Sequence, residues 1–421
     1  MNQTKEHKPG YKNTPLGWIP EEWEELSILT LARNKKENFD DGDWIEAEYL
    51  TSNGIRLIQT GNIGIGVFVD KESTKYISDE SFHELRCKEI IPGDILICRL
   101  AAPAGRACIL PDIGEGKIIT SVDVSIFRPN EELVCKQYII SVFSLDRWFK
   151  IVNERCGGST RSRIARGELG KILVPIPPIK EQQKIARTIE TWNIAIQSTR
   201  QLIKQLKERN RGLTQQLLTC KKRLNGFNGK WQHVQVREIA SEISIKNKTG
   251  KTLTVLSCTK YHGLVDSLEY FGRKIYSEDT STYKVVPYAH FAYATNHIEE
   301  GSIGYQSLYK EALISPMYTV FKTTEQVDDN YLYKVLKSQH YIHEYRKRME
   351  GSIDRRGGLR WDEFSKIPIQ LPPTEEQKAI ASVLDKATEE LKLYEQQLAN
   401  RQQQKNGLMQ KLLSGEVRVR T

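Results

Sequence analysis

The sequence contains one long stretch twice, at residues 177–224 and again from Pro372. The two copies align without a gap at one constant offset (372 − 177 = 195). The residues that are identical in both copies are Pro177/Pro372, Pro178/Pro373, Glu181/Glu376, Gln182/Gln377, Ile185/Ile380, Ala186/Ala381, Gly212/Gly407, Leu213/Leu408, Leu217/Leu412 and Leu218/Leu413. Self-similarity at a long fixed period indicates a duplicated structural unit. Any fold proposed for this chain must therefore contain the same unit twice.

Both copies have the residue spacing of a coiled-coil helix. Apolar residues recur at alternating steps of four and three, with Gln, Lys and Glu between them. The residues predicted to form the seams are Ile185, Ile189, Trp192, Ile196, Ile203, Leu206, Leu213 and Leu217 in the first copy, and Ile380, Leu384, Leu391, Tyr394, Leu398, Leu408 and Leu412 in the second. The Pro-Pro before each copy blocks a helix until the Glu-Gln that follows. The first helix would then be about 58 Å long at ~1.5 Å per residue.

Two such helices in one chain bury their seams most easily on each other, and the antiparallel direction is favoured. In that direction Arg401 faces Ile196 and Lys405 faces Trp192, and a long cationic stem over an indole ring is tolerated. A parallel pairing would instead leave two polar layers adjacent. The alternative is two separate amphipathic helices, each packed on its own domain.

The repeat extends beyond the helices to a whole domain. The segment around Trp23 has a relative around Trp231, and in each half short β-type runs with turns are followed by a helical pattern. We therefore expect an α+β fold with two tandem mixed, β-rich domains, separated and followed by long helices that pair as an antiparallel coiled coil. The expected boundaries are a loose leader at 1–14, a first domain at 15–176, a central helix at 177–224, a second domain at 225–371, and a C-terminal helix with its tail at 372–421.

Composition limits the class of protein. A chain of 421 residues is too long for one ordinary core, and its net charge of +9 suggests an anionic partner. The seven cysteines are odd in number and form no C-x-x-C, as is typical of reduced thiols and not of a disulfide frame or a zinc site. No apolar run approaches the ~18 residues that cross a bilayer. We therefore expect a soluble, cytoplasmic protein that binds no membrane and no metal.

Matched arginine-containing loops precede both Pro-Pro pairs, GGSTRSRIARGELGKILVPIPP and EGSIDRRGGLRWDEFSKIPIQLPP. A guanidinium donates two hydrogen bonds in one plane, which suits phosphate and guanine, while Asn can pair with adenine. The residues predicted to contact DNA are Gln59, Thr60, Asn62, Arg99, Arg106, Thr160, Arg161 and Arg163 in the first domain, and Lys260, Tyr261, His262, Asn296, His297, Arg355, Arg356 and Arg360 in the second. Each of them could instead be a phosphate contact or a plain surface residue, because most protein–DNA hydrogen bonds go to the backbone.

This organisation resembles the specificity subunit (HsdS family) of Type I restriction–modification systems. The resemblance rests on two globules that each end in G-S…R…I-P-x-P-P…E-Q…I, on the long helices that follow, and on the openings PLGWIPEEWE and GKW. It extends from about Pro15 to Val419. The first helix departs from the pattern, since it ends in LLTCKK where the second ends in LLSGE.

The resemblance implies a DNA-reading subunit without a catalytic site of its own. Each globule would be a target recognition domain that reads one half of a split site in double-stranded DNA, and the helices would set the gap between the halves. The implied partners are two methyltransferase subunits and usually two motor–nuclease subunits. S-adenosylmethionine, and ATP with Mg²⁺ for restriction, are expected on those partners, and no cofactor is expected on this chain.

An enzyme and a protein-binding scaffold are the competing classes. The sequence lacks the N-P-P-F/Y tetrapeptide of an adenine methyltransferase and its Gly-rich cofactor turn. Asp112 and Glu115 imitate a nuclease motif, but they are too close in sequence for ligands on paired strands. A single-chain methylase or nuclease is therefore disfavoured. Salt-dependent DNA binding would separate the DNA-reading subunit from a scaffold that binds only proteins.

Overall fold

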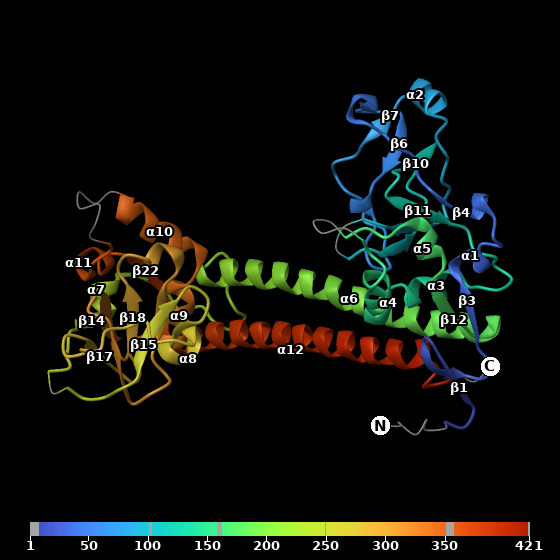
Figure 1. Cartoon of the computed structure of the whole chain (residues 1–421). Helices are drawn as coiled ribbons and strands as arrows, with labels where there is room; N and C mark the ends of the chain where they lie inside the picture. The colour runs from blue at the N-terminus through green and yellow to red at the C-terminus, as the bar shows by residue number, and fades with distance from the viewer. Residues whose placement is uncertain (1–7, 101–102, 158–161, 249, 351–357, 420–421) are drawn as a thin grey trace. The chain divides into compact units, whose positions relative to one another are not determined.

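The structure, a computed structural model, describes residues 8–100, 103–157, 162–248, 250–350 and 358–419 (Figure 1). The chain forms two compact units. Unit 1 comprises Met1–Arg200 with Gln397–Thr421, and unit 2 comprises Gln201–Gln396. Each unit therefore contains one β-rich domain, part of the central helix and part of the C-terminal helix.

The elements that begin in unit 1 alternate short strands with short helices. In chain order they are β1 (Tyr11–Thr14), β2 (Gly17–Pro20), β3 (Glu24–Ser27), α1 (Ile28–Leu31), η1 (Lys36–Asn38), β4 (Phe39–Asp41), η2 (Ala47–Tyr49), β5 (Leu50–Thr51), β6 (Ile55–Ile58), η3 (Thr60–Asn62), β7 (Tyr76–Ile77), α2 (Asp79–Glu84), β8 (Ile95–Cys98), β9 (Ala107–Ile109), β10 (Ile118–Thr120), β11 (Val124–Phe127), α3 (Lys136–Val142), α4 (Asp146–Asn153), α5 (Arg166–Gly170), β12 (Leu173–Ile176) and α6 (Ile179–Leu218).

The elements that begin in unit 2 follow nearly the same order. They are β13 (Gln232–Gln235), α7 (Val236–Ile239), β14 (Ala240–Ile243), β15 (Val255–Thr259), β16 (Gly263–Asp266), α8 (Ser267–Phe271), β17 (Lys284–Pro287), β18 (Phe291–Ala294), η4 (Ile298–Glu300), β19 (Ile303–Tyr305), β20 (Glu311–Ile314), β21 (Tyr318–Thr323), α9 (Asp329–Leu336), α10 (Gln339–Glu350), α11 (Trp361–Phe364), β22 (Pro368–Leu371) and α12 (Thr374–Leu413).

The two domains share most of their sheet topology, as the duplication predicts. One four-stranded sheet has the order β4-β11-β8-β9 in unit 1 and β14-β21-β18-β19 in unit 2. The second four-stranded sheet differs, with the order β10-β6-β7-β5 in unit 1 and β16-β15-β20-β17 in unit 2. It contains one parallel strand pair in each unit, β6 with β10 and β15 with β20. The opening strand of each domain, β3 or β13, pairs antiparallel with the strand just before the Pro-Pro, β12 or β22. The expected two-domain α+β fold is confirmed.

The N-terminal leader needs a correction. We predicted a loose segment at 1–14, but Tyr11–Thr14 forms β1 and pairs antiparallel with β2. The Tyr11 hydroxyl also donates a hydrogen bond to the carbonyl of Gly415, 2.9 Å away. Gly415 lies 404 residues away in the sequence, so the polar segment gives no local signal of this contact.

Two buried glutamates attach the start of each long helix to its domain. In unit 1, Glu181 accepts hydrogen bonds from the Trp23 indole (3.1 Å) and from Arg418 (2.6 and 2.9 Å). In unit 2, Glu376 accepts them from the Trp231 indole (3.1 Å) and from Arg223 (3.0 and 2.5 Å). We call each Trp–Glu–Arg set a carboxylate clamp.

The neighbouring glutamine makes a second matched attachment. The side-chain amide of Gln182 donates to the carbonyls of Leu133 and Pro177 and accepts from the amide of Cys135. The side-chain amide of Gln377 donates to the carbonyls of Gln326 and Pro372 and accepts from the backbone amide of Asp328. These bonds satisfy backbone groups that burial would otherwise leave unpaired. The repeated Glu-Gln of the sequence is therefore the point at which each helix joins its domain.

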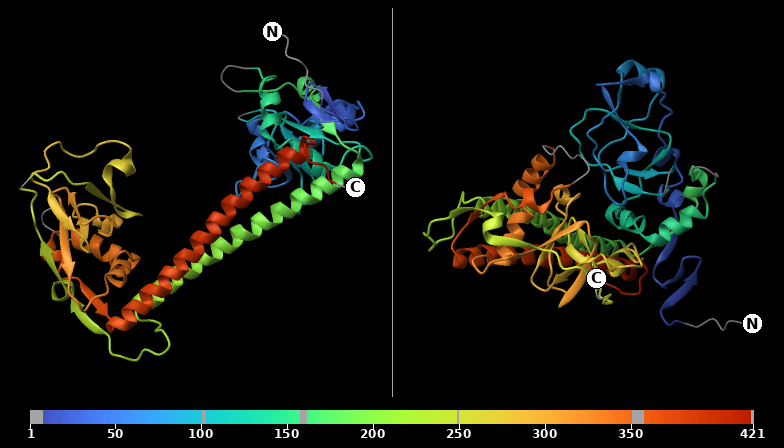
Figure 2. Two further views of the ribbon diagram at one scale, coloured as in Figure 1. Left: turned by 90° about the horizontal axis from the view of Figure 1, so that it is seen from below. Right: turned by 90° about the vertical axis from the view of Figure 1, so that its left-hand side faces the viewer.

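The helices pair antiparallel inside each unit, which confirms the predicted direction (Figures 1 and 2). In unit 1, Arg401 of α12 donates to the Thr199 hydroxyl of α6, 2.5 Å away. In unit 2, Arg209 pairs with Glu390 at 2.6 Å and Lys207 with Glu395 at 2.8 Å. All the predicted seam residues are buried or half-buried.

The ends of the helix pair complete the two hydrophobic cores. The main core of unit 1 contains Trp23, Ile185 from the start of α6 and Leu412 from the end of α12. The main core of unit 2 contains Trp231, Ile380 from the start of α12 and Leu217 from the end of α6. Each domain is thus closed by the beginning of one helix and the end of the other.

We predict that Glu376→Ala destabilises unit 2 by about 3 kcal/mol, because it breaks a buried charge pair and leaves the Trp231 indole without its acceptor. The matched control is Glu375→Ala. Glu375 is on the same helical turn with its side chain 78% exposed, and it pairs only with Lys378. The control should change stability by under about 1 kcal/mol. Calorimetric melting of both variants is the measurement, and equal shifts would contradict the role of the clamp.

Candidate nucleic-acid interface

The turn after β6 brings together three residues predicted to contact DNA. Asn62 is buried, and its side chain accepts from the backbone amide of Gln59 (3.0 Å) and donates to the Val69 carbonyl (3.0 Å). Gln59 and Asn62 together form a capping box around η3. Asn62 therefore shapes the turn, whereas Gln59 and Thr60 are half-buried at its surface.

Two predicted arginines hold loops together inside unit 1. The Arg106 guanidinium donates to the carbonyls of Ile63 (3.0 Å) and Thr60 (3.2 Å) and so braces the same turn. Arg99 is only 4% exposed, and it pairs with Asp41 at 3.0 Å. Burial lowers the pKa of Arg99, and the charge of Asp41 opposes that effect. In this structure the guanidinium of Arg99 lies inside the domain and not at its surface.

The loop before the Pro-Pro packs on the β8–β9 loop in unit 1 and, in the same way, on the β18–β19 loop in unit 2. The Ile164 amide donates to the Arg99 carbonyl at 3.1 Å, and the Leu359 amide donates to the Thr295 carbonyl at 2.7 Å. Arg163 is half-exposed and pairs with Asp123 at 3.0 Å. Thr160, Arg161, Arg355 and Arg356 lie outside the described residues.

A polar hollow of about 550 Å³ lies beside the turn after β6. Gln59 and Thr60 line it together with two lysines that sequence reasoning missed, Lys71 and Lys75. Exposed Trp44 stands at its edge. Two lysines four residues apart in the polar segment VDKESTK were the signal that could have found this surface. The carboxylates of Asp43 and Asp123 also line this hollow. Its lysines suit a sugar–phosphate backbone, and its amides and indole suit a base.

In unit 2 the predicted residues that the structure describes lie at the surface. Lys260, Tyr261 and His262 form the exposed turn between β15 and β16, and the Tyr261 side chain is 77% exposed. The Lys260 ammonium lies 5.4 Å from the centre of the Tyr261 ring. Lys337 fixes the turn from beneath, because its ammonium donates to the carbonyls of Lys260 and Gly301 at 2.7 Å each.

The other predicted residues of unit 2 line two hollows that share Met317 and Tyr318. Asn296 and His297 line one of about 290 Å³, and Arg360 lines the other of about 440 Å³ together with Lys284. The first occupies the place in unit 2 that the polar hollow has in unit 1, at the end of the parallel strand pair. The duplicated domain thus has a hollow at the matched place in each unit, lined by different side chains.

Metal binding has one geometric candidate among the described residues. One ligand atom each from His297, Glu299 and Glu300 lies within 4.8 Å of the others. They follow one another on a surface turn, where acidic groups often gather without a metal, so we assign no metal site to them.

Both halves of the chain match one family of known proteins. The family described as "Type I restriction modification DNA specificity domain" matches residues 20–208 and 228–401. The chain belongs to this family. The two matches fall on the two copies of the duplicated unit.

Relatives of similar length support the same assignment. The chain is 23% identical to a putative type I restriction enzyme MjaX specificity subunit of Methanocaldococcus jannaschii, over 98% of this chain and 97% of the relative. The solved HsdS subunit from Thermoanaerobacter tengcongensis has a similar fold, with a TM-score of 0.58 and 16% identity over 95% of this chain and 98% of that one. A chain from work on complex assembly and conformational transition of the type I R-M system matches with a TM-score of 0.59 and 16% identity, over 95% and 99% of the two chains.

Within the described part of the chain, none of the helices has the length and apolar character needed to cross a membrane.

We predict that Arg99→Ala lowers the stability of unit 1 by about 3 kcal/mol. The substitution removes the guanidinium that pairs with Asp41 and that donates hydrogen bonds to the carbonyls of Val122 and Ile164. Arg163→Ala, which removes a guanidinium 45% exposed, should change stability by less than about 1 kcal/mol. Thermal melting of both variants tests this. An Arg99→Ala chain as stable as the parent would return Arg99 to the candidate DNA contacts.

Proposed function

We propose that this chain is the DNA specificity subunit of a Type I restriction–modification complex, and that each unit reads one half of a split site in double-stranded DNA. The observation that supports the proposal is that the family model matches the chain twice, once on each copy of the repeated domain and its helix. As a member of a family of DNA specificity domains, the chain recognises DNA and leaves its modification to other subunits.

The concave surfaces of the two units are the proposed recognition sites. In unit 1, Lys71 and Lys75 would neutralise phosphates while Gln59 and Thr60 face a base edge. In unit 2, Arg360 would contact phosphate and Asn296 a base edge from the two hollows, and Tyr261 would add an aromatic contact from the exposed turn between β15 and β16. Phosphate contacts position a protein on DNA, and base contacts give it sequence preference. Different side chains on the same frame fit the reading of two unlike half-sites.

The helix pair is the proposed spacer between the half-sites. α6 and α12 each contain 40 residues, which corresponds to about 60 Å at ~1.5 Å per residue. That length lies between one and two turns of B-DNA at about 34–36 Å per turn. Two recognition surfaces carried by such helices would read two short sequences separated by a gap of constant length.

The proposed partners are two methyltransferase subunits that carry S-adenosylmethionine, and two motor–nuclease subunits that use ATP and Mg²⁺. A duplicated frame supports a pair of like partners, because each copy presents an equivalent surface to one copy of the same protein. No cofactor is assigned to this chain.

We predict that the double variant Lys71→Ala, Lys75→Ala binds DNA more weakly than the parent by at least about 1 kcal/mol when the chain is loaded with methyltransferase. The slope of the logarithm of the DNA association constant against the logarithm of salt concentration should also become shallower by about 2, because each lost phosphate contact removes about one unit. The control is Lys171→Ala, whose side chain is 69% exposed and does not line the hollow. Fluorescence anisotropy over a salt series measures both quantities. A parent complex whose DNA affinity does not depend on salt would contradict DNA binding itself, whereas an unchanged double variant would exclude only this hollow.

A further inference from the structure

Arg56, in strand β6, carries a buried charge with few partners. Its side chain is 3% exposed, and the residue lines the polar hollow of unit 1. Nη2 lies 3.2 Å from the carboxylate of Asp70, and the central carbon of the guanidinium lies 5.5 Å from the centre of the Tyr76 ring. Nε and Nη1 have no acceptor among the residues that the structure describes. A buried guanidinium is costly unless its donors are paired, so these two donors need an explanation.

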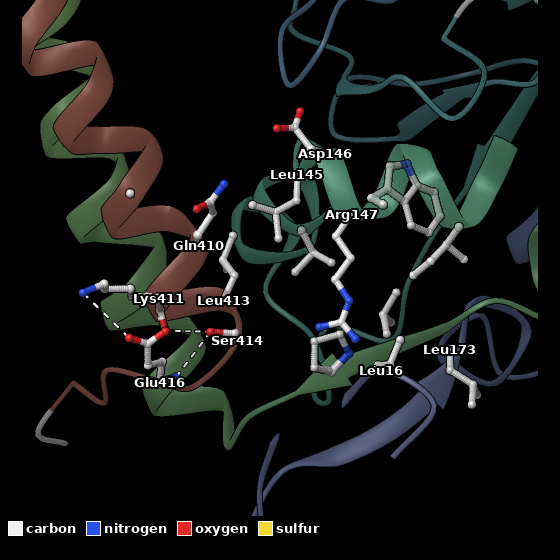
Figure 3. A pocket seen from close by; sticks show the side chains of 16 residues that line it. Leu16, Leu145, Asp146, Arg147, Leu173, Gln410, Lys411, Leu413, Ser414 and Glu416 are labelled. Atoms are coloured by element: carbon white, nitrogen blue, oxygen red, sulfur yellow. Dashed lines mark hydrogen bonds and ion pairs between the residues drawn. The ribbon is translucent and has the colours of Figure 1, made fainter. Parts of the chain in front are cut away.

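Arg99 shows how a structural arginine is held in the same domain. It is as deeply buried as Arg56, but its Nε pairs with Asp41 at 3.0 Å. Its Nη1 and Nη2 donate to the carbonyls of Ile164 and Val122. In the groove between α4 and the end of α12, the charged side chains are exposed instead, namely Asp146, Arg147, Lys411 and Glu416 (Figure 3). Arg56 fits neither pattern, because it is buried and has an acceptor for only one nitrogen.

The duplicated domain does not require an arginine at this place. β6 lies between β10 and β7, and β15 lies in the same way between β20 and β16. The parallel pair begins with Arg56 opposite Ile118 in unit 1, and with Val255 opposite Leu313 in unit 2. Val255 therefore occupies the place of Arg56, and it too lines the hollow of its unit. It is 5% exposed and belongs to an apolar cluster. Since the sheet accepts valine here, the fold alone does not explain the arginine of unit 1.

Asp70 is a weak partner for the guanidinium. Its side chain is 68% exposed. It lies in the segment 70–74, between backbone hydrogen bonds made by Val69 and Lys75. Nε and Nη1 are closed off from water in this structure, so an incoming acceptor has to displace part of their surroundings. Asp70 is the part that costs least to displace, because an exposed ion pair contributes little stability.

The variation between the units favours a base over a phosphate as the ligand of Arg56. Phosphates are alike in both half-sites, whereas bases differ, so a contact to phosphate gives no reason for Arg56 in one unit and Val255 in the other. Guanine is the base that suits a guanidinium, because it presents the acceptors O6 and N7 side by side. Such a contact discriminates strongly in a buried site, where the wrong base leaves the donors unpaired.

We propose that Arg56 contacts a guanine of the half-site read by unit 1, and that this contact replaces the Arg56–Asp70 pair when DNA binds. The proposal rests on the proposed function, since it takes the ligand of the hollow to be DNA. Arg56 is then a residue that determines specificity, and one position of that half-site is a G·C pair because of it.

The experiment maps methylated motifs in cells that carry the full chain with a methyltransferase subunit of the same system. The parent chain is compared with Arg56→Met and Arg56→Lys. In Arg56→Met, one half of the motif should relax at one G·C position, while the other half and the gap stay unchanged. The purified complex should lose at least about tenfold of its preference for the parental duplex over one with A·T at that position. Arg56→Lys should relax the same position, because lysine keeps the charge but cannot form the two parallel hydrogen bonds.

Thermal melting separates this role from a structural one. Arg56→Met removes a poorly paired buried charge and keeps most of the volume, so the variant should melt at or above the temperature of the parent. Arg99→Met is the matched control, and it should melt lower, because every nitrogen of that guanidinium has a partner.

Four outcomes would overturn the proposal. They are an Arg56→Met chain that melts as low as Arg99→Met, a parental motif without a G·C pair in either half, an unchanged motif in Arg56→Met, or binding that weakens equally for every duplex, as expected of a phosphate contact. The parent chain tests the proposed function separately. Salt-dependent DNA binding and a split motif in the parent, with no change in Arg56→Met, would remove only the role of Arg56, whereas a parent complex without salt-dependent DNA binding would remove the DNA-reading function itself.

Discussion

A buried carboxylate at the start of each long helix is the interaction on which the architecture depends. Glu181 and Glu376 are 1% and 0% exposed, and each is held by an indole from the opening of its domain and by a guanidinium that follows the other helix. A buried charge is costly unless it is paired and hydrogen-bonded. The clamp therefore forms only when the domain, the beginning of one helix and the end of the other are all in place.

The clamps also explain how the two ends of the chain belong to one unit. Arg418 comes only three residues before the C-terminus, yet it pairs with Glu181 and with Glu22 near the N-terminus. In unit 2, Arg223 from the segment that follows α6 pairs with Glu376. The central and C-terminal helices are thus equivalent parts, each of which starts in one unit and ends in the other. The coiled coil follows from this exchange, and its polar contacts, such as Arg401 with Thr199, fix the register.

Much of this architecture could be predicted from the sequence, because the sequence contains the same domain and helix twice. The constant offset revealed the duplication, the four–three spacing revealed the helix pair, and the seam cations gave its direction. The role of Glu-Gln could not be predicted, since its partners lie up to 237 residues away. Arg99 and Arg106 matched the chemistry of DNA contacts, but long-range pairing with Asp41 and with loop carbonyls turns them inward. Lys71 and Lys75 were missed because no repeat or periodicity marks them. The repeated strands and helices could be predicted because they occur twice. The side chains of the recognition surfaces differ between the two units, so only the structure locates them.

The central claim is that two unlike recognition surfaces on one repeated frame read two half-sites at a fixed separation. The most direct test is to map methylated bases by single-molecule sequencing in cells that carry this chain together with a methyltransferase subunit of the same system. The account predicts a split, non-palindromic motif with a gap of constant length, and an exchange of residues 15–176 for the equivalent domain of a relative should change one half of the motif and leave the other half and the gap intact. Methylation of a single continuous site, or a domain exchange that changes both halves together, would contradict it.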